Sequence, residues 1–258
     1  MIPLCLTFVL CGVVSAIGST YFLEQAKHLD RKVGRIKVPL VLLLWFYDQG
    51  RQFFSKLYVM ISSCFGDSES DSDSDPRRRY VAPIGVAVSM VFSILCCITA
   101  AKVETRRLDT VKSHGLVDKP DERIPMSIFW LLPQFILLGA MDGIHNTSIP
   151  YFFAEQVLAS MARYMTIFTK GVFGGGIMGS ALSVHIIEKK TRWFKSTLNQ
   201  SRLDNYYWVL ATLSAVNFAL YVVIAVFNHY RDARTVDLDE PDQKNDDDCD
   251  CDCNVSCC

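Results

Sequence analysis

Apolar residues fall into six blocks along the chain, and the charged residues gather between these blocks. The hydrocarbon layer of a bilayer is about 30 Å thick, which an α-helix crosses in roughly 20 residues. Each block is near that length. The blocks are Met1–Leu23, Val38–Ile61, Tyr80–Ala101, Ile124–Ala154, Tyr164–Ile187 and Tyr206–Phe227. The pattern predicts an all-α membrane protein with six transmembrane helices.

The blocks differ in how strongly hydropathy supports them. The first, third and sixth contain no charged residue, and the first also lacks the basic start of a cleavable signal peptide. The fourth contains one acid, Asp142, and the fifth contains Lys170. The second is interrupted by Asp48, Arg51 and Lys56, so it is the weakest candidate for a span.

The connections and the C-terminus define the domain organisation. Residues 1–231 are interpreted as one six-helix transmembrane bundle. Within it, residues 66–79 are an acidic run followed by arginines, a composition that cannot bury a core and predicts a solvated loop. Residues 102–123 are charged throughout and are interpreted as another connection. Residues 232–258 are acidic and rich in cysteine, which predicts a disordered tail.

Charge and cysteine content exclude several classes of function. A net charge of -1 over 258 residues gives no case for nucleic acid binding. Half of the ten cysteines lie in or beside apolar blocks, where a thiol behaves as a small apolar side chain. The others close the tail without the paired spacing of a zinc site, so no metal is expected, although acylation there stays open. No nucleophile with a base and no phosphate loop is found, which predicts a protein that is not an enzyme and needs no cofactor.

The apolar blocks also contain longer sequence motifs that occur together in a fixed order. In order, the later blocks contain IPMSIFWLLPQFILLGAMDGI, YFFAEQ, SMARYMTIFTKGVFGGGIMGS and WFKSTLNQSRLDNYYWVLATLSAVNFALY. These words resemble the last three helices of the plant nitrate and peptide transporter family, the proton-dependent oligopeptide transporter branch of the major facilitator superfamily. The earlier words CGVVSAIGSTYFLEQA and VPLVLLLWFYDQ resemble the seventh and eighth helices of that family.

The resemblance implies the C-terminal half of a carrier. Family members have twelve helices in two bundles, hold the substrate between the bundles, and carry a glutamate-rich proton-coupling motif on the first helix. The chain then corresponds to the C-terminal bundle alone. The implied function is proton-coupled transport of a small solute, nitrate or another anion or a peptide, across the plasma or vacuolar membrane. The implied partners are the lipid bilayer, the proton and solute, and an N-terminal half or full-length carrier.

A second hypothesis belongs to a different class of function. The chain could be a truncated membrane protein that does not transport but binds or modulates full-length carriers.

The candidate substrate-binding residues are polar groups in or beside the apolar blocks. A carboxylate inside a spanning helix is costly and normally faces the bundle interior, so Asp142 is the first candidate. Helical spacing places His145 and Asn146 on the same stripe, and the resemblance implies that an acid at Asp142 lines the substrate cavity. A structural pairing of Asp142 with a neighbouring helix is the alternative. Lys170 is a candidate partner of Asp142 or of an anionic substrate. The alternative is that its side chain extends to the membrane interface. Gln25 is placed at the outer mouth by the resemblance, or is an interfacial residue.

Two further patterns concern helix shape and packing. Gly171, Gly175 and Gly179 recur every four residues and predict a face on which another helix approaches closely. Pro133 lies inside the fourth block and predicts a kink there.

Two indications of orientation disagree. The resemblance implies a cytosolic C-terminus, which places residues 24–37, 102–123 and 189–202 on the outer or luminal side. These segments are rich in lysine and arginine, which the positive-inside rule assigns to the cytosol. Glycosylation sequons at Asn199 and Asn254 offer a test, because a glycan marks the luminal side.

Overall fold

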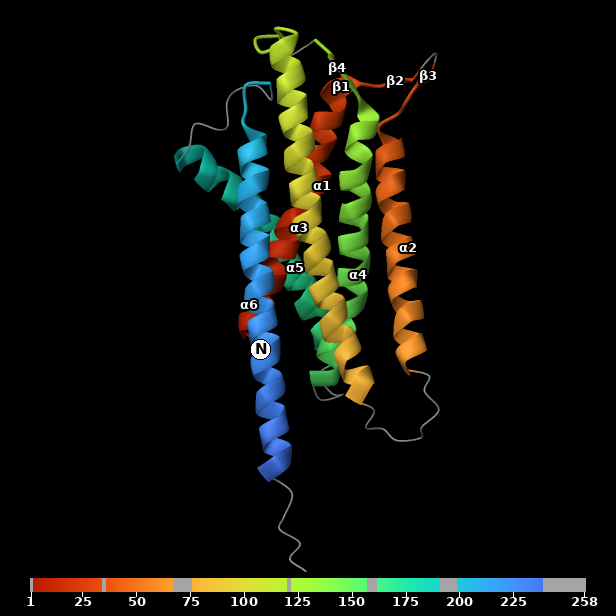
Figure 1. The fold of residues 1–258 in the computed structure, drawn as a ribbon, viewed down its shortest axis with the longest axis vertical. Helices are drawn as coiled ribbons and strands as arrows, with labels where there is room; N and C mark the ends of the chain where they lie inside the picture. The colour runs from red at the N-terminus through yellow and green to blue at the C-terminus, as the bar shows by residue number, and fades with distance from the viewer. Residues whose placement is uncertain are drawn as a thin grey trace, which may run out of the picture. The chain divides into compact units, whose positions relative to one another are not determined.

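The computed structural model describes residues 2–33, 36–66, 76–119, 122–156, 162–190 and 199–238. Within these ranges the chain forms six long helices, shown in Figure 1. They are α1 (Ile2–His28), α2 (Val41–Gly66), α3 (Pro76–Ser113), α4 (Leu132–Gln156), α5 (Ala162–Lys190) and α6 (Leu203–Leu238). The chain divides into two compact units, Met1–Val222 and Val223–Cys258. The helix contacts described below all lie within the first unit.

Four of the helices contain segments long and apolar enough to cross a membrane. These segments are Phe8–His28, Val81–Ser113, Ile128–Tyr151 and Leu203–Phe227. Helices α2 and α5 are of comparable length but do not meet this criterion in the described residues. They coincide with the second and fifth apolar blocks, which carry charged residues in their interiors. The expectation of a helical membrane protein is confirmed, and four of the six expected spans meet this criterion of length and composition.

Helix α3 is longer than the apolar block that predicts it. It continues to Ser113, so the first half of the expected connection at 102–123 is helical. The reason is amphipathic spacing: one side of the extension is exposed and the other is buried. The buried side consists of Val103, Glu104, Arg107, Leu108 and Val111.

The expected loop and tail are described only in part. Gly66 ends α2, Pro76–Arg79 form the first turn of α3, and residues 67–75 lie outside the described residues. Helix α6 continues to Leu238, beyond the expected start of the tail at 232, and residues 239–258 lie outside the described residues.

Short strands follow α1 and precede α4. The expectation of an all-α fold did not include them. Strand β1 (Leu29–Asp30) pairs in parallel with β4 (Ile124–Ser127), and β2 (Lys32–Val33) pairs antiparallel with β3 (Ile36–Lys37). Leu29 and Ile124 face each other in the β1–β4 register and are both fully buried. This pair fastens the end of α1 to the segment before α4 (Figure 1).

Pro133 begins a helix and does not kink one. A single 3₁₀ turn at Ile128–Leu131, capped by the Ser127 hydroxyl, precedes α4, and Pro133 is the second residue of α4. Proline is favoured in the first helical turn because its missing N–H would have no intrahelical partner there. The expectation of a kink at Pro133 is therefore wrong.

Glycines let two pairs of helices approach backbone to backbone. On α4, a Cβ added to Gly139 or Gly143 would collide with the backbone of Tyr47 or Arg51 on α2. Helix α5 meets α1 in the same way, because a Cβ on Gly176 would lie 2.7 Å from Cα of Gly12.

The expected glycine face of α5 is thus misplaced by one residue. Added Cβ atoms on Gly171 and Gly175 would meet nothing within 4 Å in the described structure, whereas Gly179 lies near Val13. The packed face of α5 contains Gly176, and the prediction is wrong for Gly171 and Gly175.

Replacing Gly143 by alanine is expected to lower the free energy of unfolding by about 1–3 kcal/mol, because the new methyl group overpacks a rigid backbone contact with Arg51. Gly175→Ala is the matched control, since its methyl group enters open space and alanine favours helix by up to about 1 kcal/mol. Denaturation of the two variants in detergent compares them. Equal stability would contradict close packing of α2 against α4.

Candidate functional site

Asp142 lies on α4 and is 1% exposed. Its Oδ2 atom accepts hydrogen bonds from the Ser15 hydroxyl of α1 at 2.8 Å and the Tyr47 hydroxyl of α2 at 2.7 Å. The glycine contacts of α4 bring α2 close enough for the second bond. Among the residues that the structure describes, the Oδ1 atom of Asp142 has no hydrogen-bond partner. Buried polar atoms are nearly always bonded, so this free acceptor calls for an explanation.

His145 lies one turn further along α4 and is also buried. Its Nδ1 atom is 3.4 Å from the hydroxyl oxygen of Ser89 on α3, and that hydroxyl also donates to the Val86 carbonyl at 2.7 Å. Because a hydroxyl has one proton, the contact with His145 requires the proton on Nδ1. The imidazole ring packs against Phe8 of α1 and Phe173 of α5, at centroid distances of 5.9 and 6.0 Å. Asp142 and His145 therefore face the interior together.

Asn146 and Lys170 are placed differently. Asn146 is exposed on α4, so the expected polar stripe divides, with His145 turned inward and Asn146 outward. Lys170 is exposed on α5. Among the described residues, Lys170 forms neither an ion pair nor a hydrogen bond with Asp142. The structure does not bring these two residues to Asp142.

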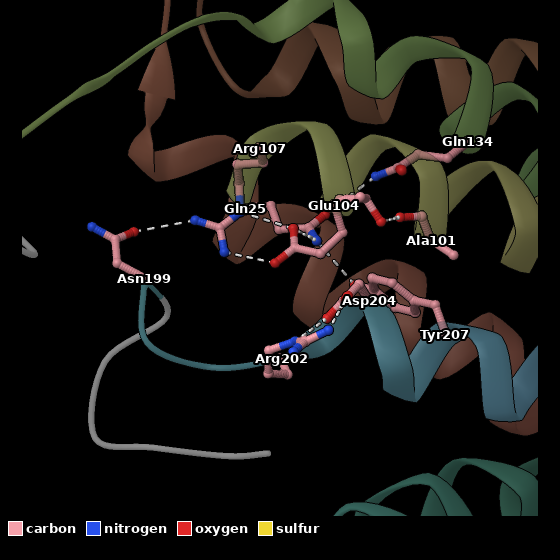
Figure 2. A network of polar contacts seen from close by, with 10 residues as sticks. Gln25, Ala101, Glu104, Arg107, Gln134, Asn199, Arg202, Asp204 and Tyr207 are labelled. Atoms are coloured by element: carbon pink, nitrogen blue, oxygen red, sulfur yellow. Dashed lines mark hydrogen bonds and ion pairs between the residues drawn. The ribbon is translucent and has the colours of Figure 1, made fainter. Parts of the chain in front are cut away.

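Gln25 belongs to a separate buried network, shown in Figure 2. The residue is 1% exposed, and its side-chain amide donates to the Glu104 carboxylate at 2.7 Å and the Tyr207 hydroxyl at 3.2 Å. Its carbonyl oxygen accepts a bond of 3.4 Å from Gln134. Gln25 thus joins α1 to α3, α4 and α6.

The centre of this network is an ion pair that the sequence analysis missed. Glu104 and Arg107 are both buried on α3, with guanidinium bonds of 2.6 and 2.8 Å to the two carboxylate oxygens. Arg107 also donates to Oδ1, the side-chain amide oxygen of Asn199, at 3.1 Å. The apolar residues at helical spacing around this pair could have indicated a buried helix face. The many charged residues of the segment indicated a connection instead.

Tyr47 and Ser15 were also missed as partners of Asp142. The sequence words contain the Tyr47–Asp48 pair, and the structure separates its two members. Tyr47 points to Asp142, whereas Asp48 is paired with Arg51 and Gln52 at 2.7 Å on the accessible side of α2.

The described residues contain no group of three or more His, Cys, Asp or Glu side chains that could hold a metal ion. The cysteines of the tail lie outside these residues.

Long apolar helices packed around buried polar side chains define this chain as a helical membrane protein with several candidate spans. No family model matches the sequence. Over 225 residues it is 39% identical to Protein NRT1/PTR FAMILY 5.5 of Arabidopsis thaliana, a match that covers 86% of this chain and 42% of the relative. Over the matched residues the chain belongs to the NRT1/PTR family.

Two further Arabidopsis thaliana proteins support the assignment. NRT1/PTR FAMILY 5.10 is 31% identical over 232 residues, covering 86% of this chain and 41% of the relative. NRT1/PTR FAMILY 5.14 is 30% identical over 246 residues, covering 90% and 42%. The chain spans less than half the length of these curated relatives. The family expected from the sequence is confirmed. Membership of this family agrees with the expectation of a membrane protein that is not an enzyme.

Proposed function

We propose that this chain supplies the C-terminal six-helix bundle of a proton-coupled carrier for a small solute, either nitrate or another anion or a peptide. The carrier would reside in the plasma or vacuolar membrane. Family membership and the 42% share of a relative's length support this assignment. The observation that carries it is Oδ1 of Asp142, a buried acceptor among three helices that has no partner within the described part of the chain.

The hydrogen bonds of Asp142 determine what it can bind. Ser15 and Tyr47 both donate to Oδ2, so the group holds its position through one oxygen and keeps the other as an acceptor. An acceptor of this kind suits a proton or an N–H group of a solute. A purely structural carboxylate is more often bonded through both oxygens.

Charge links the solute to the proton. An ionised carboxylate in a medium of low dielectric repels an anion strongly, so nitrate would bind near Asp142 only when that group carries a proton. A peptide amino group, in contrast, would bind the ionised form. Both routes couple the solute to the protonation of one residue.

The other candidate residues take lesser roles in this proposal. His145 lines the same interior as a polar neighbour. Asn146 and Lys170 are exposed in this chain, so they would reach the solute only if the second bundle covers that side. Gln25, held by Glu104 and Tyr207, would act by fixing α1 rather than by direct contact.

Reconstitution of two halves tests the proposal. The chain would be co-expressed with an N-terminal half of NRT1/PTR FAMILY 5.5, and solute uptake driven by a proton gradient would be measured in proteoliposomes. We expect uptake with both halves and none with either half alone. Stable association of the halves without uptake would contradict transport and favour a protein that binds and modulates full-length carriers.

A further inference from the structure

Asn199 begins an Asn-Gln-Ser sequon, the pattern of an N-glycan acceptor in an accessible loop. The structure gives it a different environment. The residue is 5% exposed, and both polar atoms of its side chain are bonded. Oδ1 accepts from Arg107 at 3.1 Å, and Nδ2 donates to the carbonyl oxygens of Leu116 at 3.1 Å and Lys119 at 3.5 Å.

The carbonyl groups that Asn199 contacts belong to the turn after α3. Gly115 ends that helix with a φ of 63°, a left-handed conformation that glycine adopts without strain. The amide of Leu116 then returns to the Val111 carbonyl at 2.9 Å. The Leu116 carbonyl accepts from the amide of Lys119 at 3.2 Å, and Nδ2 of Asn199 is a second donor to it.

The other side of Asn199 reaches the buried ion pair. Glu104 accepts bonds from Nε and Nη2 of Arg107, and Asn199 accepts one from Nη1 (Figure 2). A buried guanidinium is stabilised only when its donors are paired. Asn199 therefore pairs one donor of the buried guanidinium while it also bonds the turn after α3.

We propose that Asn199 has a structural role, tying the turn before α6 to the end of α3 through Arg107, and that it is not a glycan acceptor in the folded chain. An N-glycan replaces a hydrogen on Nδ2, which the structure commits to the turn carbonyls. A glycan is also bulky, so attachment would pull Asn199 out of the network.

Gln200 provides a matched control in the same sequon. It is half-buried, and its amide donates to the exposed Asp118 carboxylate at 3.1 Å. The two neighbours thus both contact the turn after α3, but only Asn199 bonds the buried guanidinium.

The test is thermal unfolding of the full chain, produced in a bacterial host without N-glycosylation and purified in detergent. Asn199→Ala is expected to lower Tm by about 5 °C or more, and Gln200→Ala by less than about 2 °C. The milder Asn199→Ser is expected to fall between them and keeps the comparison available if the alanine variant does not fold.

A double-mutant cycle ties the effect to Arg107. The Tm losses of Asn199→Ser and Arg107→Lys are expected to be less than additive in the double variant, because each removes the same bond. Additive losses, or equal Tm values for the alanine variants of Asn199 and Gln200, would overturn the proposal. So would a glycan on Asn199 in folded chain from a eukaryotic host whose Tm does not change when the glycan is removed.

Discussion

Replacing Glu104 by glutamine is expected to lower the free energy of unfolding by about 3–5 kcal/mol. The substitution keeps the shape of the side chain but removes the negative charge, so the buried guanidinium of Arg107 loses the carboxylate that it is bonded to. Both side chains are at most 1% exposed, which removes the solvent screening that weakens surface pairs. Chemical denaturation of the full chain in detergent measures the change.

The chain offers a matched control for this prediction. Lys119 and Glu122 form an ion pair of 2.9 Å with the same three-residue spacing, but their side chains are 59% and 53% exposed. Glu122→Gln is therefore expected to cost less than about 1 kcal/mol. Replacing both Glu104 and Arg107 by leucine is expected to recover only part of the loss, since the two buried charges are gone but Gln25 and Asn199 each lose a bond. Equal effects of Glu104→Gln and Glu122→Gln would show that the buried pair does not stabilise the fold.

Asp142→Asn is expected to reduce proton-driven uptake by the reconstituted halves by about tenfold or more, equivalent to ~1.4 kcal/mol. Asparagine preserves the volume of the side chain but cannot exchange a proton, so the coupling group is lost. With nitrate as the solute, wild-type uptake is expected to rise as the pH on the uptake side falls, because the anion binds only when Asp142 carries a proton. In the variant this dependence on pH should disappear.

Two further substitutions separate the site from its surroundings. Tyr47→Phe removes one of the two donors to Asp142 and is expected to reduce uptake less than Asp142→Asn. Asp48→Asn changes the next residue of α2, on the accessible side, and should leave uptake unchanged. If Asp142→Asn keeps the wild-type rate and pH profile, Asp142 is a structural residue.

Hydropathy was sufficient to locate the helices because an apolar segment in a bilayer must satisfy its backbone polar groups internally. The same argument predicted that Asp142 turns inward, since an isolated carboxylate facing lipid is costly. Its partners could not be predicted. The chain contains many serine and tyrosine residues. Only the packing of α1 and α2 on α4 brings Ser15 and Tyr47 to Asp142.

The buried network shows why sequence spacing alone fails. Glu24 and Lys27 have the same spacing as Glu104 and Arg107, and their ion pair is exposed. The difference comes from α1, α4 and α6, which cover one pair and not the other. The glycine face of α5 failed for a related reason, because a shift of one residue turns a helix by about 100°. The contact of Gly176 with Gly12 sets that rotation.

The parallel pairing of β1 with β4 has a consequence for biosynthesis. Leu29 leaves the ribosome before α2 and α3 are made, and its partner Ile124 follows only after them. Until then the end of α1 lacks its backbone partner, so its polar groups must remain hydrated rather than enter lipid. Closure of this end of the bundle is therefore a late step, and nascent chains that stop before Ile124 should leave the end of α1 open to proteases.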